Sequence, residues 1–411
     1  MRAIRLIMTA AVSGILFMSL PATAERVAED TDTIGEAIRT PQALDLKPFT
    51  TVRDGSQIIH LPAGTYRMST TLRLPSNTVL EGAGDATLLK ADSSFNGSQL
   101  ITNSDYVGGN TNISIRNLRM EVTSPLLPGD EPGILRFKNV EQLVIDNLTL
   151  LIESPMFGID LSAQIRNATV QGCTIISTNK MSGGGIMIRN GDPLPARATS
   201  SIVVRHNWIE SASDEPVAAF GWEGMVENVL IEENTIKAEG ASFGITTFGI
   251  DSRKQRGKIH DVSIIGNRIS GSKVGGIGIK GGARLIQVIG NSIKDTEGDG
   301  IFLHAGGEGL PGIQDIRILQ NKILNAGRHC IFATGTNIQV QENEITHCAQ
   351  NGIYAAGNVS VVNNVISDAK PGILVYGKQG NDIRGNELRN AGGGVLFLNE
   401  DVPALKGKDA R

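Results

Sequence analysis

The sequence predicts an all-β solenoid built from short parallel strands. From about residue 200 to residue 395, one unit recurs as a β-branched run, Asn-x-Ile, a polar turn, Gly-Ile with three further residues, and a second turn. The clearest copies are VQENEITHCAQNGIYAAG, from Val340, and VVNNVISDAKPGILVYG, from Val361. The recurring asparagines are Asn207, Asn234, Asn267, Asn291, Asn321, Asn343, Asn364 and Asn386.

The spacing of this unit explains the prediction. The last four asparagines follow one another after 22, 21 and 22 residues. A fixed period of this size is typical of a solenoid, because one unit cannot bury its apolar face without a neighbour. Apolar residues alternate with a period of two, which indicates strands. We therefore expect the asparagines to stack inside the cylinder, about 4.8 Å apart. Upstream, Asn117, Asn147 and Cys173 are expected in the same column.

A second pattern opens the repeat region. Pro62, Gly64 and Tyr66 form a Pro-x-Gly-x-Tyr turn, and Gly82 and Gly84 form Gly-x-Gly. With the coils, these residues resemble the opening of the right-handed parallel β-helix, pectate-lyase-like superfamily. That superfamily includes pectate lyases, polygalacturonases, alginate epimerases and phage tailspikes. The resemblance implies a single-stranded right-handed parallel β-helix of about 11 to 12 coils with an N-terminal cap. It implies no particular reaction.

Four segments are predicted. Residues 1–24 have the layout of a secretory signal peptide, with two arginines, an apolar run and small residues at the end. A membrane anchor would need a longer apolar span. Residues 25–74 are expected to form a cap and entry strand, because an open β-helix end exposes unpaired backbone groups. Residues 75–398 form the β-helix, and residues 399–411 form a flexible tail. We therefore expect a bacterial periplasmic or secreted protein, with no stable membrane span after cleavage.

Composition narrows the choice of partner. The formal net charge is −4, from 42 acidic and 38 basic residues, which gives no basic surface for nucleic acid. The oligomeric state stays open. Of three cysteines, at least one must be free, and none has zinc-site spacing. Cys173, Cys330 and Cys348 are interpreted as small core or turn residues. A bridge between Cys330 and Cys348 stays open, because their registers differ.

The longer coils predict a groove. A bare coil needs 21 or 22 residues, and the surplus of four longer coils falls directly after the Gly-Ile strand. In a solenoid, insertions collect on one face, which is often the binding face. The four loops, residues 190–200, 221–227, 249–258 and 305–312, should form a wall beside this strand.

The floor of that groove follows from strand alternation, which points the second and fourth residues after the glycine outward. The fourth positions include Phe137, Arg189, Phe220, Phe248, Lys280, His304 and Tyr376, and the second positions include Asp160, Phe302, Phe332 and Tyr354. Aromatic rings pack against sugar rings, and cations bind carboxylates. The predicted substrate-binding residues are Phe220, Trp222, Phe248, Phe302, Arg253 and Tyr354. Alternatively, the aromatic residues only stabilise the β-helix through cross-strand pairs.

Lys280 and His304 share a register on adjacent coils, about 5 Å apart. Two neighbouring cations lower each other's pKa, so either could act as a base. A polyuronide lyase could use Lys280 as base, His304 as acid or base and Arg189 as carboxylate clamp. The placement is similar to Lys and Arg-His positions of chondroitinase- and alginate-lyase-like enzymes, although His304 stands where Arg-His-Gly is expected. Alternatively, both side chains are simply solvated.

Acidic residues in the loops suggest further roles. Asp214, Glu223 and Asp251 could bind Ca²⁺ through hard oxygen ligands, or a pair of them could serve a hydrolase. The sequence lacks the complete signatures of polygalacturonases and of alginate epimerases. The leading interpretation is an exported polysaccharide lyase acting on an acidic, uronate-containing polysaccharide. A hydrolase, an epimerase, or a non-catalytic periplasmic glycan-binding or scaffold protein are the alternatives.

Overall fold

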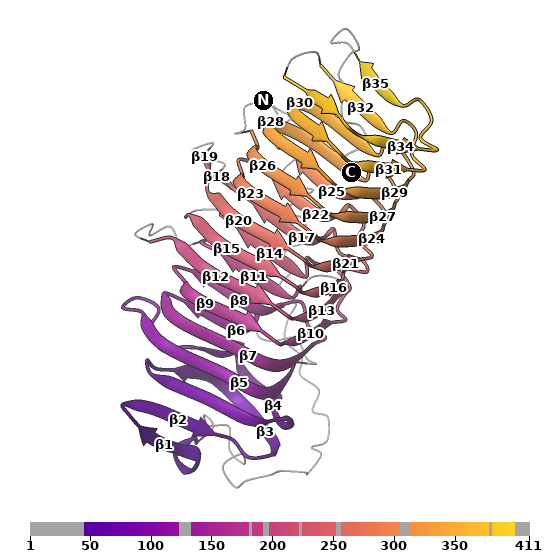
Figure 1. The fold of residues 1–411 in the computed structure, drawn as a ribbon. Coiled ribbons are helices and arrows are strands. Elements are labelled where there is room, and N and C mark those ends of the chain that lie inside the picture. The colour runs from indigo at the N-terminus through magenta and orange to yellow at the C-terminus, as the bar shows by residue number, and fades with distance from the viewer. Residues whose placement is uncertain are drawn as a thin grey trace, which may run out of the picture.

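The computed structural model describes residues 45–122, 133–180, 183–191, 197–221, 224–251, 256–304, 312–377 and 380–398. These residues wind into one elongated cylinder of stacked coils, shown in Figure 1. The chain enters through the antiparallel pair β1 (Thr50–Arg53) and β2 (Ser56–His60), which follows a short 3-10 turn. From β2 onward, neighbouring coils pair in parallel. The predicted all-β, right-handed parallel β-helix is confirmed. The predicted signal peptide and C-terminal tail lie outside the described residues.

Each regular coil contributes one strand to each of three ladders that run along the cylinder (Figure 1). The Gly-Ile ladder contains the Gly-Ile strands. It comprises β6 (Gly133–Lys138), β8 (Phe157–Ala163), β11 (Ile186–Arg189), β14 (Val217–Phe220), β17 (Phe243–Phe248), β22 (Gly275–Lys280), β25 (Asp299–His304), the first parts of β28 (Ile331–Gln341) and β30 (Ile353–Val362), β32 (Ile373–Tyr376) and β35 (Val395–Leu398).

The entry ladder leads into each recurring asparagine, and the short ladder follows it. The entry ladder comprises β9 (Arg166–Gln171), β12 (Thr199–Arg205), β15 (Val226–Glu232), β20 (Ile259–Ile265), β23 (Arg284–Ile289), β26 (Gln314–Leu319), the later parts of β28 and β30, and β33 (Asp382–Arg384). The short ladder comprises β10 (Thr174–Ser177), β13 (Trp208–Ser211), β16 (Thr235–Lys237), β21 (Arg268–Ser270), β24 (Ser292–Thr296), β27 (Lys322–Ala326), β29 (Glu344–Cys348), β31 (Val365–Ser367) and β34 (Glu387–Arg389).

The first coils are built differently. Their strands are long and bend through more than one face: β3 (Gly64–Leu74), β4 (Thr78–Asn103), β5 (Asn110–Val122) and β7 (Val140–Ile152). One small antiparallel pair, β18 (Ile250–Asp251) with β19 (Arg256–Gly257), projects after β17.

The predicted asparagine column is confirmed from Asn207 to Asn386. The backbone N–H and Nδ2 of Asn207 donate to Oδ1 of Asn234, at 3.0 and 2.9 Å. The same pair of bonds joins each later asparagine to the next one along the chain. Each buried side-chain amide also donates to a backbone carbonyl. The buried amides of this column therefore have hydrogen-bond partners.

The upstream end of this column differs in part from the sequence prediction. Cys173 does belong to it, and its N–H donates to Asn207 Oδ1 at 2.9 Å. Asn117 and Asn147 do not, because the interior positions are taken by Leu118 and Leu148. The two asparagines sit one residue earlier, at corners with left-handed φ values of 55° and 51°. Asparagine tolerates this conformation better than most residues, which explains its presence there.

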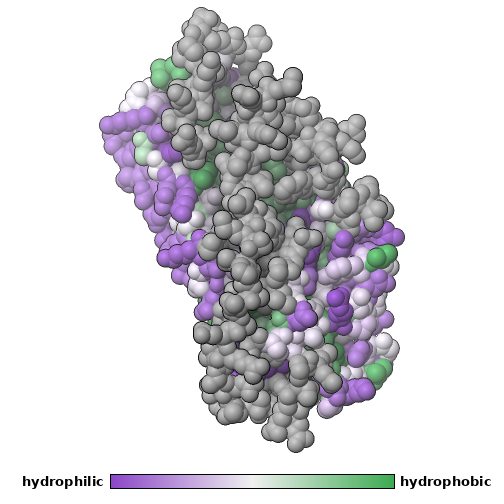
Figure 2. Space-filling view, turned by 180° about the vertical axis from the view of Figure 1, so that it is seen from behind, coloured by the Kyte–Doolittle hydropathy of each residue, from purple (hydrophilic) through white to green (hydrophobic). Residues whose placement is uncertain are grey.

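The interior is filled by Ile, Val and Leu from all three ladders. Cys330 and Cys348 are buried and form a disulfide, with their Cα atoms 5.5 Å apart, which answers the question that the sequence left open. The thiol of Cys173 is free and buried, and burial raises its pKa to about 12. Seen from behind, both long flanks of the described molecule are mainly hydrophilic (Figure 2). Within the described ranges, we find no helix with the length and apolar character needed to span a bilayer.

Candidate active site

The outward residues of the Gly-Ile ladder line up as the spacing predicted. Arg189 pairs with Phe220, which pairs with Phe248; Lys280 then follows Phe248 in the same register, and His304 follows Lys280. The described ends of the four long loops all leave this ladder after its strands. Lys280 and His304 are therefore direct neighbours on adjacent coils.

Phe137 was predicted in the same outward column, and this prediction is wrong. Its side chain is fully buried and pairs with Leu161, which faces the core. In this coil Gly133 pairs with Phe157 and not with Gly158. The Gly-Ile sequence of this strand is therefore displaced by one residue relative to the next coil. A displacement of one residue exchanges the two faces of a strand, and Arg136 takes the outward position.

Arg189 is already engaged by a carboxylate of the protein. Its Nε and Nη2 atoms donate to the two oxygens of Asp160, at 3.0 and 2.6 Å. Arg136 lies on the other side of Asp160, with its Nε 3.4 Å from Oδ2. Three strand spacings, roughly 14 Å, separate Arg189 from Lys280. The structure therefore brings two of the three predicted catalytic residues together and leaves Arg189 apart.

Lys280 lies across an aromatic ring. Its Nζ atom is 4.3 Å from the ring centroid of Phe243, which begins β17. The ring can lie there because Gly278 has no side chain; a Cβ at that position would come within 2.6 Å of the Phe243 ring. Burial lowers the pKa of Lys280, while the charges of Glu215 and Asp214 act in the opposite direction. The ammonium group is thus less firmly protonated than an exposed lysine.

Glu215 lies in the turn between β13 and β14, within electrostatic reach of Lys280. Burial raises the pKa of Glu215 to about 8, and hydrogen bonding and charge from Asp214 act in the same direction. Asp214 Oδ1 also accepts the backbone N–H of Glu215, at 2.9 Å. Glu215 therefore holds its proton to a higher pH than an ordinary glutamate does.

His304 ends β25 beside Lys280. Burial lowers its pKa, and the positive charge of Lys280 lowers it further. Its ring centroid is 5.5 Å from that of Phe302. The effect of Lys280 on His304 has the direction that the sequence predicted, whereas the lowered pKa of Lys280 comes from burial. The imidazole is consequently neutral at neutral pH, as a general base requires.

Four rings form what we call the aromatic shelf: Phe243, Phe302, Phe332 and Tyr354. Their successive centroids are 6.0, 5.4 and 4.6 Å apart, and the last two pairs are stacked. Phe302, Phe332 and Tyr354 are only half-buried. Phe220 and Phe248 make a separate edge-to-face pair at 6.0 Å. The shelf begins under Lys280 and continues past His304 toward the C-terminus.

The sequence prediction missed a third outward column, which we call the outer column. It consists of the residues just before each Gly-Ile pair: Glu215, Phe243, Gly275, Asp299, His329 and Asn351. Strict alternation does not find it, because the glycine and the following residue both face inward. A Cβ on Gly244, for example, would lie 2.4 Å from Ile269 in the core. The available signal was the set of polar residues that directly precede Gly-Ile or its equivalents.

Several predicted residues cannot be placed. Trp222, Glu223 and Arg253 lie outside the described residues, and the side chain of Asp251 is not described. Of the three predicted Ca²⁺ ligands, only Asp214 has a described side chain, and it lies beside Glu215. Among the described residues, no group of three His, Cys, Asp or Glu side chains is arranged to hold a metal ion.

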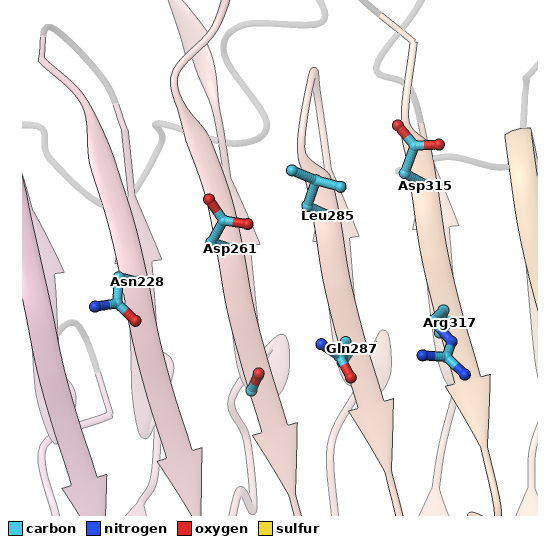
Figure 3. Close-up of a pocket in the computed structure, with 7 residues that line it drawn as sticks. Asn228, Asp261, Leu285, Gln287, Asp315 and Arg317 are labelled. Atoms are coloured by element: carbon cyan, nitrogen blue, oxygen red, sulfur yellow. The ribbon is translucent and has the colours of Figure 1, made fainter.

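A separate hollow of about 250 Å³ lies on the entry ladder, away from this site. It is lined by Asn228, Asp261, Ser263, Leu285, Gln287, Asp315 and Arg317. Figure 3 shows that their side chains rise from four neighbouring strands without converging on one point. The candidate catalytic residues Lys280 and His304 lie on the Gly-Ile ladder instead.

Comparison with known proteins gives two family matches. A right handed beta helix region matches residues 248–403, and a rhamnogalacturonase A/epimerase, pectate lyase-like family matches residues 19–192. The preneck appendage protein of Bacillus phage PZA is 29% identical over 126 residues, which is 29% of this chain and 15% of that protein. The chain thus spans only a small part of this relative's length.

Solved structures share the fold at low identity. The catalytic unit of an α-1,3-glucanase from Streptomyces thermodiastaticus has a TM-score of 0.60 and 14% identity, covering 83% of this chain and 64% of that chain. The Streptococcus pneumoniae surface adhesin PfbA has a TM-score of 0.54 and 14% identity, covering 84% and 85%. A family 28 exopolygalacturonase from Yersinia enterocolitica has a TM-score of 0.52 and 12% identity, covering 81% and 72%. With the coil geometry, the two family matches show that the chain has the right-handed parallel β-helix fold of the pectate-lyase-like superfamily.

Proposed function

We propose that the protein is an exported carbohydrate-active enzyme that cleaves an acidic, uronate-containing polysaccharide by β-elimination. The observation that carries this proposal is the in-register pair of Lys280 and His304 on adjacent coils, each with a lowered pKa. The match to the rhamnogalacturonase A/epimerase, pectate lyase-like family supports a carbohydrate substrate.

The two groups suit the steps of an elimination. Neutral His304 takes the proton α to the uronate carboxylate, and the charge of Lys280 offsets the enolate that forms. The C4–O bond breaks as the C4–C5 double bond forms, and the leaving oxygen takes a proton from water. His304 takes the role of base that the sequence suggested first for Lys280, because its imidazole is neutral at neutral pH. The aromatic shelf would hold the sugar rings beside this centre.

The closeness of Asp214 and Glu215 argues against these two residues as the carboxylate pair of a hydrolase. Such enzymes keep their two carboxyl groups about 5 to 9.5 Å apart, to leave room for the sugar and, in inverting enzymes, for water. Here the two carboxyl groups are close enough for hydrogen bonding to raise the pKa of Glu215.

The direct test uses purified protein with polygalacturonate, alginate and a glycosaminoglycan as separate substrates. Elimination predicts that ultraviolet absorbance of an unsaturated uronate rises together with reducing ends. Reducing ends without this absorbance would indicate hydrolysis, and inversion at C5 without cleavage would indicate an epimerase. His304→Ala should abolish the signal, whereas Lys322→Met, on the short ladder, should not change it. Lys280→Arg should keep part of the activity if Lys280 acts only through its charge.

The pH dependence gives a second check. His304 must be neutral to act as a base, and burial and the charge of Lys280 lower its pKa. The cleavage rate should therefore rise with pH in the acidic range and level off by neutral pH. In Lys280→Met this rise should move to higher pH, because the neighbouring positive charge is lost. A rate that falls over the same pH range would exclude neutral His304 as the base.

Non-catalytic glycan binding is the second candidate. The observation that favours it is the continuous aromatic shelf, which needs no titratable group in order to hold sugar rings. The fold is similar to that of a surface adhesin, so this kind of coil stack also occurs in a protein described as an adhesin. Retention of the protein on a polyuronide without any product in the direct test would establish this alternative.

Export is the remaining part of the proposal. The predicted signal peptide at residues 1–24 motivates it, and the disulfide between Cys330 and Cys348 supports it, because disulfides persist mainly in oxidising compartments. Cell fractionation and sequencing of the mature N-terminus would test it. A cytoplasmic protein that retains residues 1–24 would refute it.

A further inference from the structure

The outward face of the Gly-Ile ladder changes from charged to uncharged side chains beyond His304. Up to that residue it carries Glu215, Lys280 and other charged groups. In the next two coils, the described outward positions hold His329 and Asn351, then Phe332 and Tyr354, then Thr334 and Ala356. No acidic or basic charge other than that of Asp299, at the edge of this region, stands among these positions at neutral pH. The aromatic shelf continues through the uncharged region.

Three buried polar residues run along the edge of the shelf. Oδ1 of Asp299 accepts the backbone N–H of His329, at 2.9 Å. Nδ1 of His329 lies 3.0 Å from Nδ2 of Asn351, which donates to it. With Nδ1 as an acceptor, the neutral ring carries its hydrogen on Nε2. Burial lowers the pKa of His329 to about 4, with a smaller effect from the charge of Arg328, so the ring stays neutral.

This polar row touches the aromatic rings. The centroid of the His329 ring is 5.6 Å from both the Phe332 and the Tyr354 centroids. The row and the shelf therefore form one continuous surface with an aromatic floor and a polar edge.

The hydrogen bonds of the row Asp299, His329 and Asn351 do not pair all of its polar atoms. Oδ2 of Asp299 is buried and has no hydrogen-bond partner among the described residues. An acceptor left unpaired in this way is expensive, and natural interiors rarely contain one without a reason. The adjoining turn carries Arg328, which is exposed and acts on Asp299 through its charge.

We propose that Phe302, Phe332 and Tyr354, with the row Asp299, His329 and Asn351, form a subsite for an uncharged stretch of glycan. Sugar rings stack on the aromatic shelf, and sugar hydroxyls bond to the polar edge. A uronate fits poorly here, because Asp299 carries negative charge at neutral pH. The proposal rests on the proposed function only in taking a glycan as the ligand, and it implies a substrate with both acidic and neutral sugars.

The test is native affinity electrophoresis in gels that contain one soluble neutral polysaccharide each: a β-glucan, a xylan, a galactan or an arabinan. We expect at least one of them to retard the wild-type protein. Tyr354→Ala and Asn351→Ala should weaken that binding roughly three- to tenfold. Tyr354→Leu keeps the apolar bulk without the aromatic face, and should weaken binding equally even if the alanine variant folds poorly.

The controls separate this subsite from general adhesion of the protein to polysaccharide. Lys322→Met, at an exposed lysine on the short ladder, should bind the neutral polysaccharide as the wild type does. Trp208→Ala, at an exposed ring on the short ladder, should also bind normally. Absence of retardation in every gel, or equal weakening by Trp208→Ala, would overturn the proposal. Retardation that depends on Tyr354 in a protein without any cleavage activity would support it and refute only the proposed function.

Discussion

Two columns of buried polar residues run parallel to the axis of this protein, and they differ in one respect. In the asparagine column, each amide from Asn207 to Asn364 bonds to the next coil and to a backbone carbonyl. In the outer column, Glu215 and Asp299 have raised pKa values, and an oxygen of Asp299 has no partner among the described residues. Fully paired buried polarity holds a fold together, whereas a buried carboxyl group with a raised pKa is a candidate for binding a ligand or taking part in a reaction.

The largest expected effect separates catalysis from stability. Lys280→Met should lower the cleavage rate roughly hundredfold to ten-thousandfold, because the enolate loses its counter-charge. The free energy of unfolding should stay unchanged or rise, since a buried ammonium is removed from the ring of Phe243. Initial rates and urea unfolding curves measure the two quantities on one sample. A variant that loses stability and rate in parallel would contradict the distinction between the columns.

Removing one member of the asparagine column should do the opposite. Asn291 accepts two bonds from Asn267, and its Nδ2 donates to Asn321 and to Ile264. Asn291→Ala should lower the free energy of unfolding by about 3 kcal/mol or more, because several buried groups lose their partners. Asn386→Ala, at the half-buried end of the column, should cost clearly less because water can replace its bonds. Equal losses in the two variants would show that burial does not control the effect.

The disulfide tests how rigidly the outer column is held. Cys330 directly follows His329, and its partner Cys348 is 18 residues further on. Replacing both by alanine should cost about 3 kcal/mol, as expected for a loop of this size. Hydrogen exchange should accelerate around His329 and Tyr354 more than around Asn321. Uniform acceleration along the chain would mean that the bridge stabilises the whole solenoid and not this part of the site.

The smallest expected effect concerns pH. Burial raises the pKa of Asp299 from 3.8 to about 6, so the folded protein holds this proton more tightly than the unfolded chain does. The free energy of unfolding should therefore fall as the pH rises from about 4 to about 6, and stay low above that range. Asp299→Asn should remove this slope and raise the free energy of unfolding at neutral pH. A slope that persists in the variant would assign it to another group.

The repeat unit allowed most of the fold to be predicted, because spacing alone sets the coil. Spacing could not show that Leu118 and Leu148 would replace asparagine in the first coils, since Asn117 and Asn147 are only one residue away. The register of Lys280 and His304 also followed from spacing. The outer column did not, because Gly-Ile places two successive residues inward and breaks the alternation. The pairing of Arg189 with Asp160 depends on side-chain packing between coils, which a linear pattern does not contain.

The bonds between neighbouring asparagines all run in one direction, from each coil to the next one along the chain. Coils that carry this asparagine can therefore follow one another in the same way, and each adds one strand spacing to the length of the stack. Removing one whole repeat, such as residues 344–364, would let Asn343 meet Asn386 and shorten the ligand-facing surface by one strand spacing. The number of repeats thus sets the length of the outward surface along the stack. Duplication of the gene segment for a single repeat is enough to change that length.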